Sequence, residues 1–159
     1  MEKIIIEARV NELEGRNGNP NVPFTPPEVI RDAKACYDAG ASIIHFHGRT
    51  PTGAPEHDPA YYLETNAGIR DVCPILIHPT LGYVAHGGDA KERFEAVEQM
   101  MKGKNTAPHF APTDVGSVNV DWWDPENNRF DTNNLVYENS TETVMYFSER
   151  IKHYGLKQY

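Results

Sequence analysis

The stretch ASIIHFHGR, residues 41–49, places two histidines and an arginine in a run that is otherwise mostly apolar. Isoleucine and phenylalanine in such a run favour a buried β-strand. Side chains alternate along a strand, so His45, His47 and Arg49 are predicted to share one face. Two imidazoles side by side near the end of a strand are spaced to bind one metal ion, and zinc is the natural candidate.

A structural explanation of the same pattern stays open. Both histidines can be hydrogen-bonded core residues, or one can be buried while the other is exposed. The short motif HxH also occurs by chance in proteins without a metal site. The surrounding residues are therefore needed to distinguish a metal site from a packed core.

The strand around this motif belongs to an alternating series of elements. Strands are predicted over residues 3–10, 42–49 and 73–82, and residues 107–120 are predicted as a fourth, irregular strand with its following loop. Helices are predicted over 26–38, 59–72, 89–103 and 140–155, with a loop over 121–134. This alternation predicts a single α/β domain over residues 1–159, with a parallel sheet covered by helices. The long connections follow the strands, so a site is expected at the carboxyl ends of the strands.

Four strand–helix units correspond to half of a (β/α)8 barrel, which typically needs about 250 residues. The chain is therefore expected to be either a complete four-unit domain or half of a barrel that stops where a fifth strand begins. A half barrel leaves two sheet edges and an apolar face open. We expect such a chain to form homo-oligomers, to aggregate, or to be part of a longer native polypeptide.

The composition of the chain excludes some classes of partner and favours one cellular compartment. The formal net charge of −8 argues against a nucleic-acid partner. No apolar stretch approaches the roughly 20 residues that span a bilayer, which argues against a membrane protein. The two cysteines, Cys36 and Cys73, lack CxxC spacing and are predicted to be reduced thiols of a cytoplasmic protein.

Further polar residues follow the other predicted strands. Glu12 and Glu14 follow the first strand, His78 and Thr80 end the third, and Thr113, Asp114, Ser117 and Asn119 follow the fourth. Each has an ordinary alternative role as a solvated loop charge, a partner of local backbone, or a core residue. Their shared position at the same end of the sheet as His45 and His47 favours a site.

The segment NPNVPFTPPEVIRDAKACYDAGASIIHFHGRTPTG, residues 19–53, closely resembles the β-keto acid cleavage enzyme family. It contains the family's NPNxPxTP loop, a helix ending in AGA, the HxHxR strand and the following TG. The stretches HPTLG and VGSVNV resemble later strand ends of the family. The resemblance implies a zinc-dependent (β/α)8 barrel in which His45 and His47 bind zinc, together with a late glutamate that has no counterpart in this chain.

The same resemblance implies substrate-binding roles for Glu14, Glu12, Thr80, Gly82, Asp114 and Arg49. Glu14 matches the family's substrate-contacting glutamate best, and Glu12 is the alternative because loop lengths differ. Thr80 matches a hydroxyl residue that holds the substrate carboxylate. Asp114 stands where some members carry asparagine, which leaves its role open, and the general base is not assigned.

The activity implied by the resemblance is condensation of a β-keto acid with acetyl-CoA, with release of acetoacetate and a new acyl-CoA. Two alternatives remain. A metal-dependent hydrolase of the amidohydrolase type also uses HxH, although there the pair usually ends the first strand and here it ends the second. The other alternative is a non-catalytic fragment that binds a metal.

Overall fold

A computed structural model describes residues 3–81 and 89–159 of the chain, and it confirms the predicted alternation of strands and helices. The alternating elements are β1 (Glu7–Arg9), α1 (Pro26–Asp38), β2 (Ile43–Phe46), α2 (Pro59–Val72), β3 (Leu76–Pro79), α3 (Ala90–Lys102), β4 (Phe110–Ala111), α4 (Thr141–His153) and β9 (Lys157–Gln158). Four further strands of two residues each lie between β4 and α4, namely β5 (Val118–Asn119), β6 (Trp123–Asp124), β7 (Arg129–Phe130) and β8 (Val136–Tyr137).

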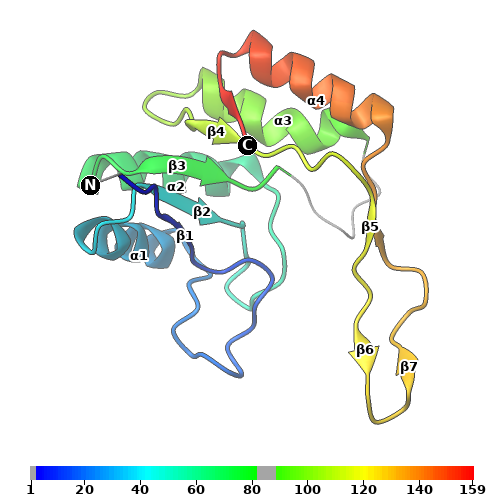
Figure 1. Cartoon of the computed structure of the whole chain (residues 1–159). Helices are drawn as coiled ribbons and strands as arrows, with labels where there is room; N and C mark the ends of the chain where they lie inside the picture. Colours follow the sequence, from blue (N-terminus) through cyan, green and yellow to red (C-terminus); the bar gives the residue numbers. More distant parts are fainter. Residues whose placement is uncertain (1–2, 82–88) are drawn as a thin grey trace.

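Within each parallel sheet, neighbouring strands of the alternating series lie in the order in which they occur along the chain (Figure 1). The first three form a parallel sheet in the order β1-β2-β3, in which His45 lies opposite His78. Strands β4 and β9 form a second parallel pair. His109 joins the two sheets. Its backbone N–H donates to the Ile77 carbonyl at 2.9 Å, and its side-chain Nδ1 accepts from the Ile77 backbone N–H at 2.9 Å.

The chain extends further than the predicted four units. Strand β9 follows α4 and pairs with β4, so the chain includes the beginning of a fifth parallel strand. Gly155 makes this possible, since its φ of +68° gives the left-handed conformation that ends a helix and turns the chain. This agrees with the expectation that a fifth strand begins after the fourth helix.

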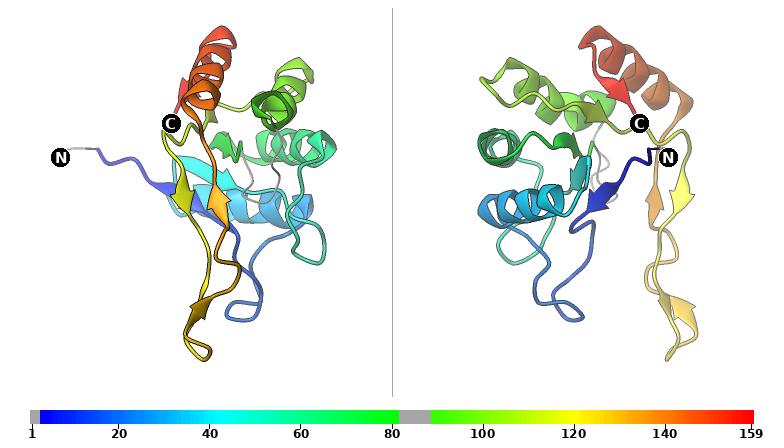
Figure 2. Two further views of the ribbon diagram at one scale, coloured as in Figure 1. Left: turned by 90° about the vertical axis from the view of Figure 1, so that its right-hand side faces the viewer. Right: turned by 60° about the vertical axis from the view of Figure 1, so that its left-hand side comes forward.

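The helices cover one face of the sheet (Figure 2). The hydrophobic core lies between the helices and this face of the sheet. Ile44, Phe46 and Ile77 point to this face and are fully buried. On α3 the buried residues are Phe94, Val97 and Met100, whereas Met101 is only partly buried. The opposite face of the sheet carries the other alternating positions, and these hold the polar residues of the site.

Several predicted strands are shorter in the structure. The strand predicted over 3–10 is confined to β1, because β2 begins only at Ile43 and residues 3–5 extend beyond its start. The segment 107–120, predicted as an irregular strand with its following loop, contains β4 and also β5, which pairs antiparallel with β8. The predicted loop 121–134 contains the antiparallel pair β6 and β7. Residues 118–137 thus form an arm that projects from the body (Figure 1).

Helix α1 begins with Thr25 as its N-cap and a proline at the first helical position. Glu28 completes the cap: its Oε2 accepts hydrogen bonds from the N–H groups of Phe24 and Thr25, both at 2.9 Å. Its Oε1 also meets Arg16 at 2.8 Å. The backbone hydrogen bond from Thr25 is the main reason that the pKa of Glu28 falls from 4.5 to about 2.

This cap makes stability depend on pH. A folded-state pKa below the unfolded one stabilises the fold above pH 4.5, and this contribution is lost as the pH falls towards about 2. We expect Glu28→Gln to lower the free energy of unfolding by about 1–2 kcal/mol at pH 7. The difference from the parent should shrink between pH 5 and pH 3 in urea unfolding followed by circular dichroism. The exposed Glu64 on α2 provides the control Glu64→Gln, and a difference independent of pH would contradict the assignment.

Two further features can be checked against the structure. Cys36 is partly buried and Cys73 is buried, and both are free thiols, as predicted. Within residues 3–81 and 89–159, no helix combines the length and the apolar composition needed to cross a bilayer.

Candidate functional site

The two histidines of the HxH motif meet at the carboxyl end of β2. The Nε2 atoms of His45 and His47 are 3.1 Å apart, and the rings lie edge to face. His45 is 5% exposed and His47 is partly buried. The predicted placement of both imidazoles on one side of the strand is confirmed.

Both imidazoles are neutral at physiological pH. Burial lowers the pKa of His45 to about 3, and the neighbouring His47 and His78 add to the effect. Burial also lowers the pKa of His47 to about 4, although the Glu12 carboxylate acts in the opposite direction. Neutral imidazole is the form that binds metal ions, so both rings are in the protonation state required of ligands.

Asn11 holds His47 in place from the loop after β1. Its Oδ1 accepts from the His47 N–H at 2.9 Å, and its Nδ2 donates to the His47 carbonyl at 2.8 Å and to the Pro23 carbonyl at 3.0 Å. The side-chain amide thus pairs with the His47 backbone as a neighbouring strand would. This pairing explains why β2 ends at Phe46 while His47 remains fixed.

Gly48 leaves the room that the motif needs. A Cβ atom at this position would lie 2.3 Å from the Glu56 carbonyl oxygen and 2.7 Å from the Tyr62 hydroxyl. The Tyr62 hydroxyl accepts from the Gly48 N–H and donates to the Glu56 carbonyl, each at 3.1 Å. Helix α2 therefore packs directly against the backbone between His47 and Arg49, and no larger residue fits there.

Arg49, two residues after His47, is 5% exposed. Its Nη1 donates to the Glu12 carbonyl at 2.7 Å and its Nε donates to the Gly53 carbonyl at 2.8 Å. The guanidinium also lies over the Phe24 ring, 4.9 Å from its centroid. Arg49 thus links the loop after β1 to the loop after β2. Its substrate-binding role stays a prediction.

A second polar pair lies on the other side of His45. The Nδ1 of His78 and the Oε1 of Glu7 are 2.8 Å apart, and the His78 ring centroid is 4.6 Å from that of His45. Burial acts to raise the pKa of Glu7, but hydrogen bonds from Tyr159 and His78 outweigh it, and the pKa is lowered. Burial lowers the pKa of His78 despite its contact with Glu7.

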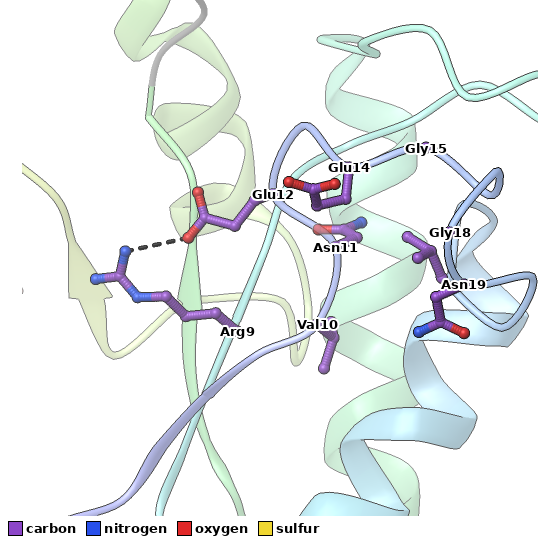
Figure 3. Close-up of a pocket in the computed structure, with 9 residues that line it drawn as sticks. Arg9, Val10, Asn11, Glu12, Glu14, Gly15, Gly18 and Asn19 are labelled. Carbon is purple, nitrogen blue, oxygen red and sulfur yellow. Dashed lines mark hydrogen bonds and ion pairs between the residues drawn. The ribbon is translucent and has the colours of Figure 1, made fainter.

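The two predicted glutamates of the first loop lie in different settings (Figure 3). The Oε2 of Glu12 is 3.8 Å from the His47 Nε2, and its Oε1 accepts from Arg9 at 3.1 Å. Glu14 is exposed and lines a cavity of about 270 Å³ together with Glu12, Arg9 and Asn11. The loop therefore brings Glu12, rather than Glu14, to the histidines.

The remaining predicted residues are spread over two strand ends. Thr80 is half-buried just after β3, and its N–H donates to the Phe46 carbonyl at 3.0 Å. Asp114 is exposed at the base of the arm, where its carboxylate accepts from the Tyr137 hydroxyl at 2.9 Å. Gly82 lies outside the described residues. The substrate-binding roles of these three residues stay predictions.

Two functional candidates, Glu7 and Asn11, are not among the predicted site residues. A signal for Glu7 exists in the sequence, because alternation within residues 3–10 places Glu7 and Arg9 on the same face of an apolar strand. Asn11 has no comparable signal, since a polar residue in a loop is ordinary.

These groups have a donor set that suits a transition metal. Within the described residues, ligand atoms of Glu12, His45 and His47 lie within 4.8 Å of one another, and so do those of Glu7, His45 and His78. Two nitrogens that bind one tetrahedral zinc at 2.0–2.1 Å are about 3.3 Å apart. The observed 3.1 Å between the His45 and His47 nitrogens is close to this value.

The fold and these residues define a parallel α/β protein with a histidine and carboxylate site at the carboxyl ends of its strands. The family model for the beta-keto acid cleavage enzyme matches residues 3–159. The chain therefore belongs to the β-keto acid cleavage enzyme family.

Curated relatives agree with this assignment. The chain is similar to the 3-keto-5-aminohexanoate cleavage enzymes of Acetoanaerobium sticklandii (38% identical) and Fusobacterium nucleatum (37% identical), each over 121 residues and 75% of the chain. It is also 28% identical to the 3-oxoadipate:acetyl-CoA acetyltransferase of Cupriavidus necator over 97% of the chain. The alignments cover 41%, 42% and 47% of these relatives, so the chain spans less than half their length.

Proposed function

We propose that this chain supplies the zinc-binding half of a β-keto acid cleavage enzyme built as a (β/α)8 barrel. The proposal rests above all on the 3.1 Å approach of two buried imidazole nitrogens at the end of β2. The family match over residues 3–159 and the order of the parallel strands support it. We further propose that the active enzyme is a cytoplasmic homo-oligomer. The open sheet of a half barrel leaves strand edges and an apolar face exposed, and contacts between subunits can cover them.

The proposed reaction is the exchange of acyl groups between a β-keto acid and acetyl-CoA. The substrates R–CO–CH₂–COO⁻ and CH₃–CO–SCoA give CH₃–CO–CH₂–COO⁻, which is acetoacetate, and R–CO–SCoA. One carbon–carbon bond and one thioester bond break and one of each forms, so neither water nor a redox equivalent is consumed. The Cupriavidus necator relative supports this class of reaction, since its name joins a 3-oxo acid to acetyl-CoA.

The residues of the chain divide the proposed work. His45 and His47 hold the zinc, which when bound acts as a Lewis acid on the ketone of the substrate. Asn11 fixes the His47 backbone, so that the two nitrogens are placed before the ion arrives. Glu14 faces the cavity beside the site and is positioned to contact the R group. The other predicted contacts to substrate are Thr80, Gly82, Asp114 and Arg49.

The test is an assay of the native protein that contains this chain. Acetyl-CoA is mixed with a panel of β-keto acids, and acetoacetate and new acyl-CoA are measured by chromatography. We expect both products in equal amounts, loss of turnover after chelation, and recovery with Zn²⁺. The variant His45→Gln should reduce turnover at least about 100-fold, whereas the exposed His153→Gln should not change it.

Three results would each contradict part of the proposal. Breakdown of the β-keto acid without acetyl-CoA would point to the hydrolase alternative. Full turnover after complete removal of metal would show that the histidine pair has a structural role. An intact mass of 17.9 kDa for the native protein would contradict the half-barrel part of the proposal, because the chain alone has that mass.

A further inference from the structure

The side chains of Glu7 and His78 meet on the polar face of the sheet, beside His45. Glu7 belongs to β1 and His78 to β3, and these strands pair with β2 on its two sides. The contact of 2.8 Å between the Glu7 Oε1 and the His78 Nδ1 therefore crosses the strand that carries His45. The function proposed above gives this pair no role.

The hydrogen bond within the pair has a defined direction. The His78 side chain is 2% exposed and that of Glu7 is 10% exposed. Hydrogen bonds from Tyr159 and His78 lower the pKa of Glu7, so its carboxylate is ionised and can only accept. The Nδ1 of His78 therefore carries a hydrogen. Burial keeps His78 neutral by lowering its pKa, so its Nε2 carries no hydrogen and can only accept.

His45 has the matching donor. The Nε2 of His78 and the Nδ1 of His45 are both buried, and within the described residues neither atom has a partner in hydrogen-bond geometry. The two rings lie 4.6 Å apart, measured between their centroids. A ring nitrogen of each and the Glu7 carboxylate lie within 4.8 Å of one another. An atom that only accepts is thus close to a ring that has one hydrogen to donate.

The position of this hydrogen decides whether His45 can bind a metal. Neutral imidazole carries a hydrogen on one nitrogen and binds a metal through the other. The Nε2 of His45 is the atom that lies 3.1 Å from the His47 Nε2, so it has to be the free nitrogen. Histidine ligands usually donate their other N–H to a fixed acceptor, which sets the tautomer and the orientation of the ring.

Two other arrangements compete with this one. The His78 backbone also lies close to His45, where it acts to raise the pKa of His45, and it is a second possible acceptor. Glu7, His45 and His78 also have metal-ligand spacing of their own. However, Glu7 and His78 already bond to each other, and the Nε2 of His45 faces His47. A supporting role therefore fits the pair better than a second metal site.

We propose that Glu7 and His78 are positioning residues that hold the hydrogen of His45 on Nδ1 and so present its Nε2 to zinc. This inference rests on the proposed zinc site of His45 and His47. It adds no ligand to the set that the family resemblance implies.

The experiment compares His78→Leu, His78→Gln and the control His109→Gln in the native protein that contains this chain. Zn²⁺ affinity is measured by competition with a chromogenic chelator. We expect His78→Leu to weaken binding about 10–100-fold, as loss of a partner of a metal ligand does. Glutamine at position 78 can accept from His45 and donate to Glu7, so its affinity should stay close to that of the parent. His109 also contacts β3 but lies outside the ligand groups, and its variant should bind as the parent does.

A second readout reports on the hydrogen itself. In protein loaded with Co²⁺, the ring N–H protons of the histidine ligands give NMR signals far from all others. The His45 signal should exchange slowly with solvent in the parent and faster in His78→Leu, while the His47 signal serves as the internal reference. Glu7→Gln should also speed exchange and weaken zinc binding about tenfold, because an amide can donate to His78 and reverse its tautomer. The exposed Glu64→Gln is its control.

The outcomes separate this inference from the zinc site itself. Parent-like zinc affinity in folded His78→Leu would overturn the inference, leave the histidine site intact and identify the backbone as the partner. Equal losses for His78→Leu and His78→Gln would show that the ring acts by packing, which also overturns it. If His78→Leu does not fold, parent-like affinity and exchange in Glu7→Gln would overturn the inference. A parent protein that binds no zinc would overturn the proposed function as well.

Discussion

Replacing His47 with alanine is expected to lower the affinity of the chain for Zn²⁺ at least about 100-fold, and His45→Ala should have the same effect. Each substitution removes one of two nitrogens that lie 3.1 Å apart in a buried setting. The remaining imidazole cannot hold the ion with comparable strength, because one nitrogen ligand on its own gains little over water. Competition with a chromogenic chelator measures the loss directly.

The control for this prediction is His153→Ala, since His153 is exposed on the last turn of α4. His45 is buried, so His45→Ala also leaves a cavity, and His45→Gln serves as a variant that better preserves volume. Circular dichroism verifies that each variant is folded. Zinc affinity equal to that of the parent in folded His45 and His47 variants would return the pair to the role of hydrogen-bonded core residues.

Asn11→Ala is expected to lower the free energy of unfolding by about 3 kcal/mol. Asn11 is 3% exposed, and its side chain makes three hydrogen bonds, two of them to the His47 backbone. Alanine leaves the buried N–H and carbonyl groups of this loop without partners, which is among the larger single-residue effects. Zinc affinity should fall as well, because the His47 backbone loses its restraint. Urea unfolding followed by circular dichroism gives the stability.

The matched control is Asn17→Ala, which changes an exposed asparagine of the same loop and should alter stability by less than about 0.5 kcal/mol. A loss below about 1 kcal/mol for Asn11→Ala would mean that water replaces the amide at this position. A large loss of stability with unchanged zinc affinity would show that Asn11 supports the loop without positioning His47.

The helices of this fold are predictable because their signals are local. Helix α2 has the predicted bounds, since Pro59 opens the helix and Pro74 follows its end. The start of α1 has a local signal as well, since Thr25 is its N-cap and Pro26 follows. The strands are less predictable, because the end of a strand depends on its neighbour. Residues 3–5 have the composition of a strand, but they extend beyond the start of β2.

The site divides in the same way. His45 and His47 are predictable because two residues along one strand share a face whatever surrounds them. The contact of Glu7 with His78 joins residues 71 positions apart, and it depends on the register of three strands. The choice of Glu12 over Glu14 depends on a single backbone rotation in the loop. Register and rotation are set by packing, which composition and spacing do not encode locally.

The projecting arm has a spectroscopic consequence. The chain contains two tryptophans, and both lie in residues 118–137, where Trp122 is 64% exposed and Trp123 is 50% exposed. The Trp123 ring contacts Phe130 of the same arm, with centroids 5.1 Å apart. Indole fluorescence therefore reports on the arm and its surroundings, whereas the histidine site and the helical core contribute only tyrosine emission. Melting of the arm and melting of the core can thus be recorded as two separate signals from one unlabelled sample.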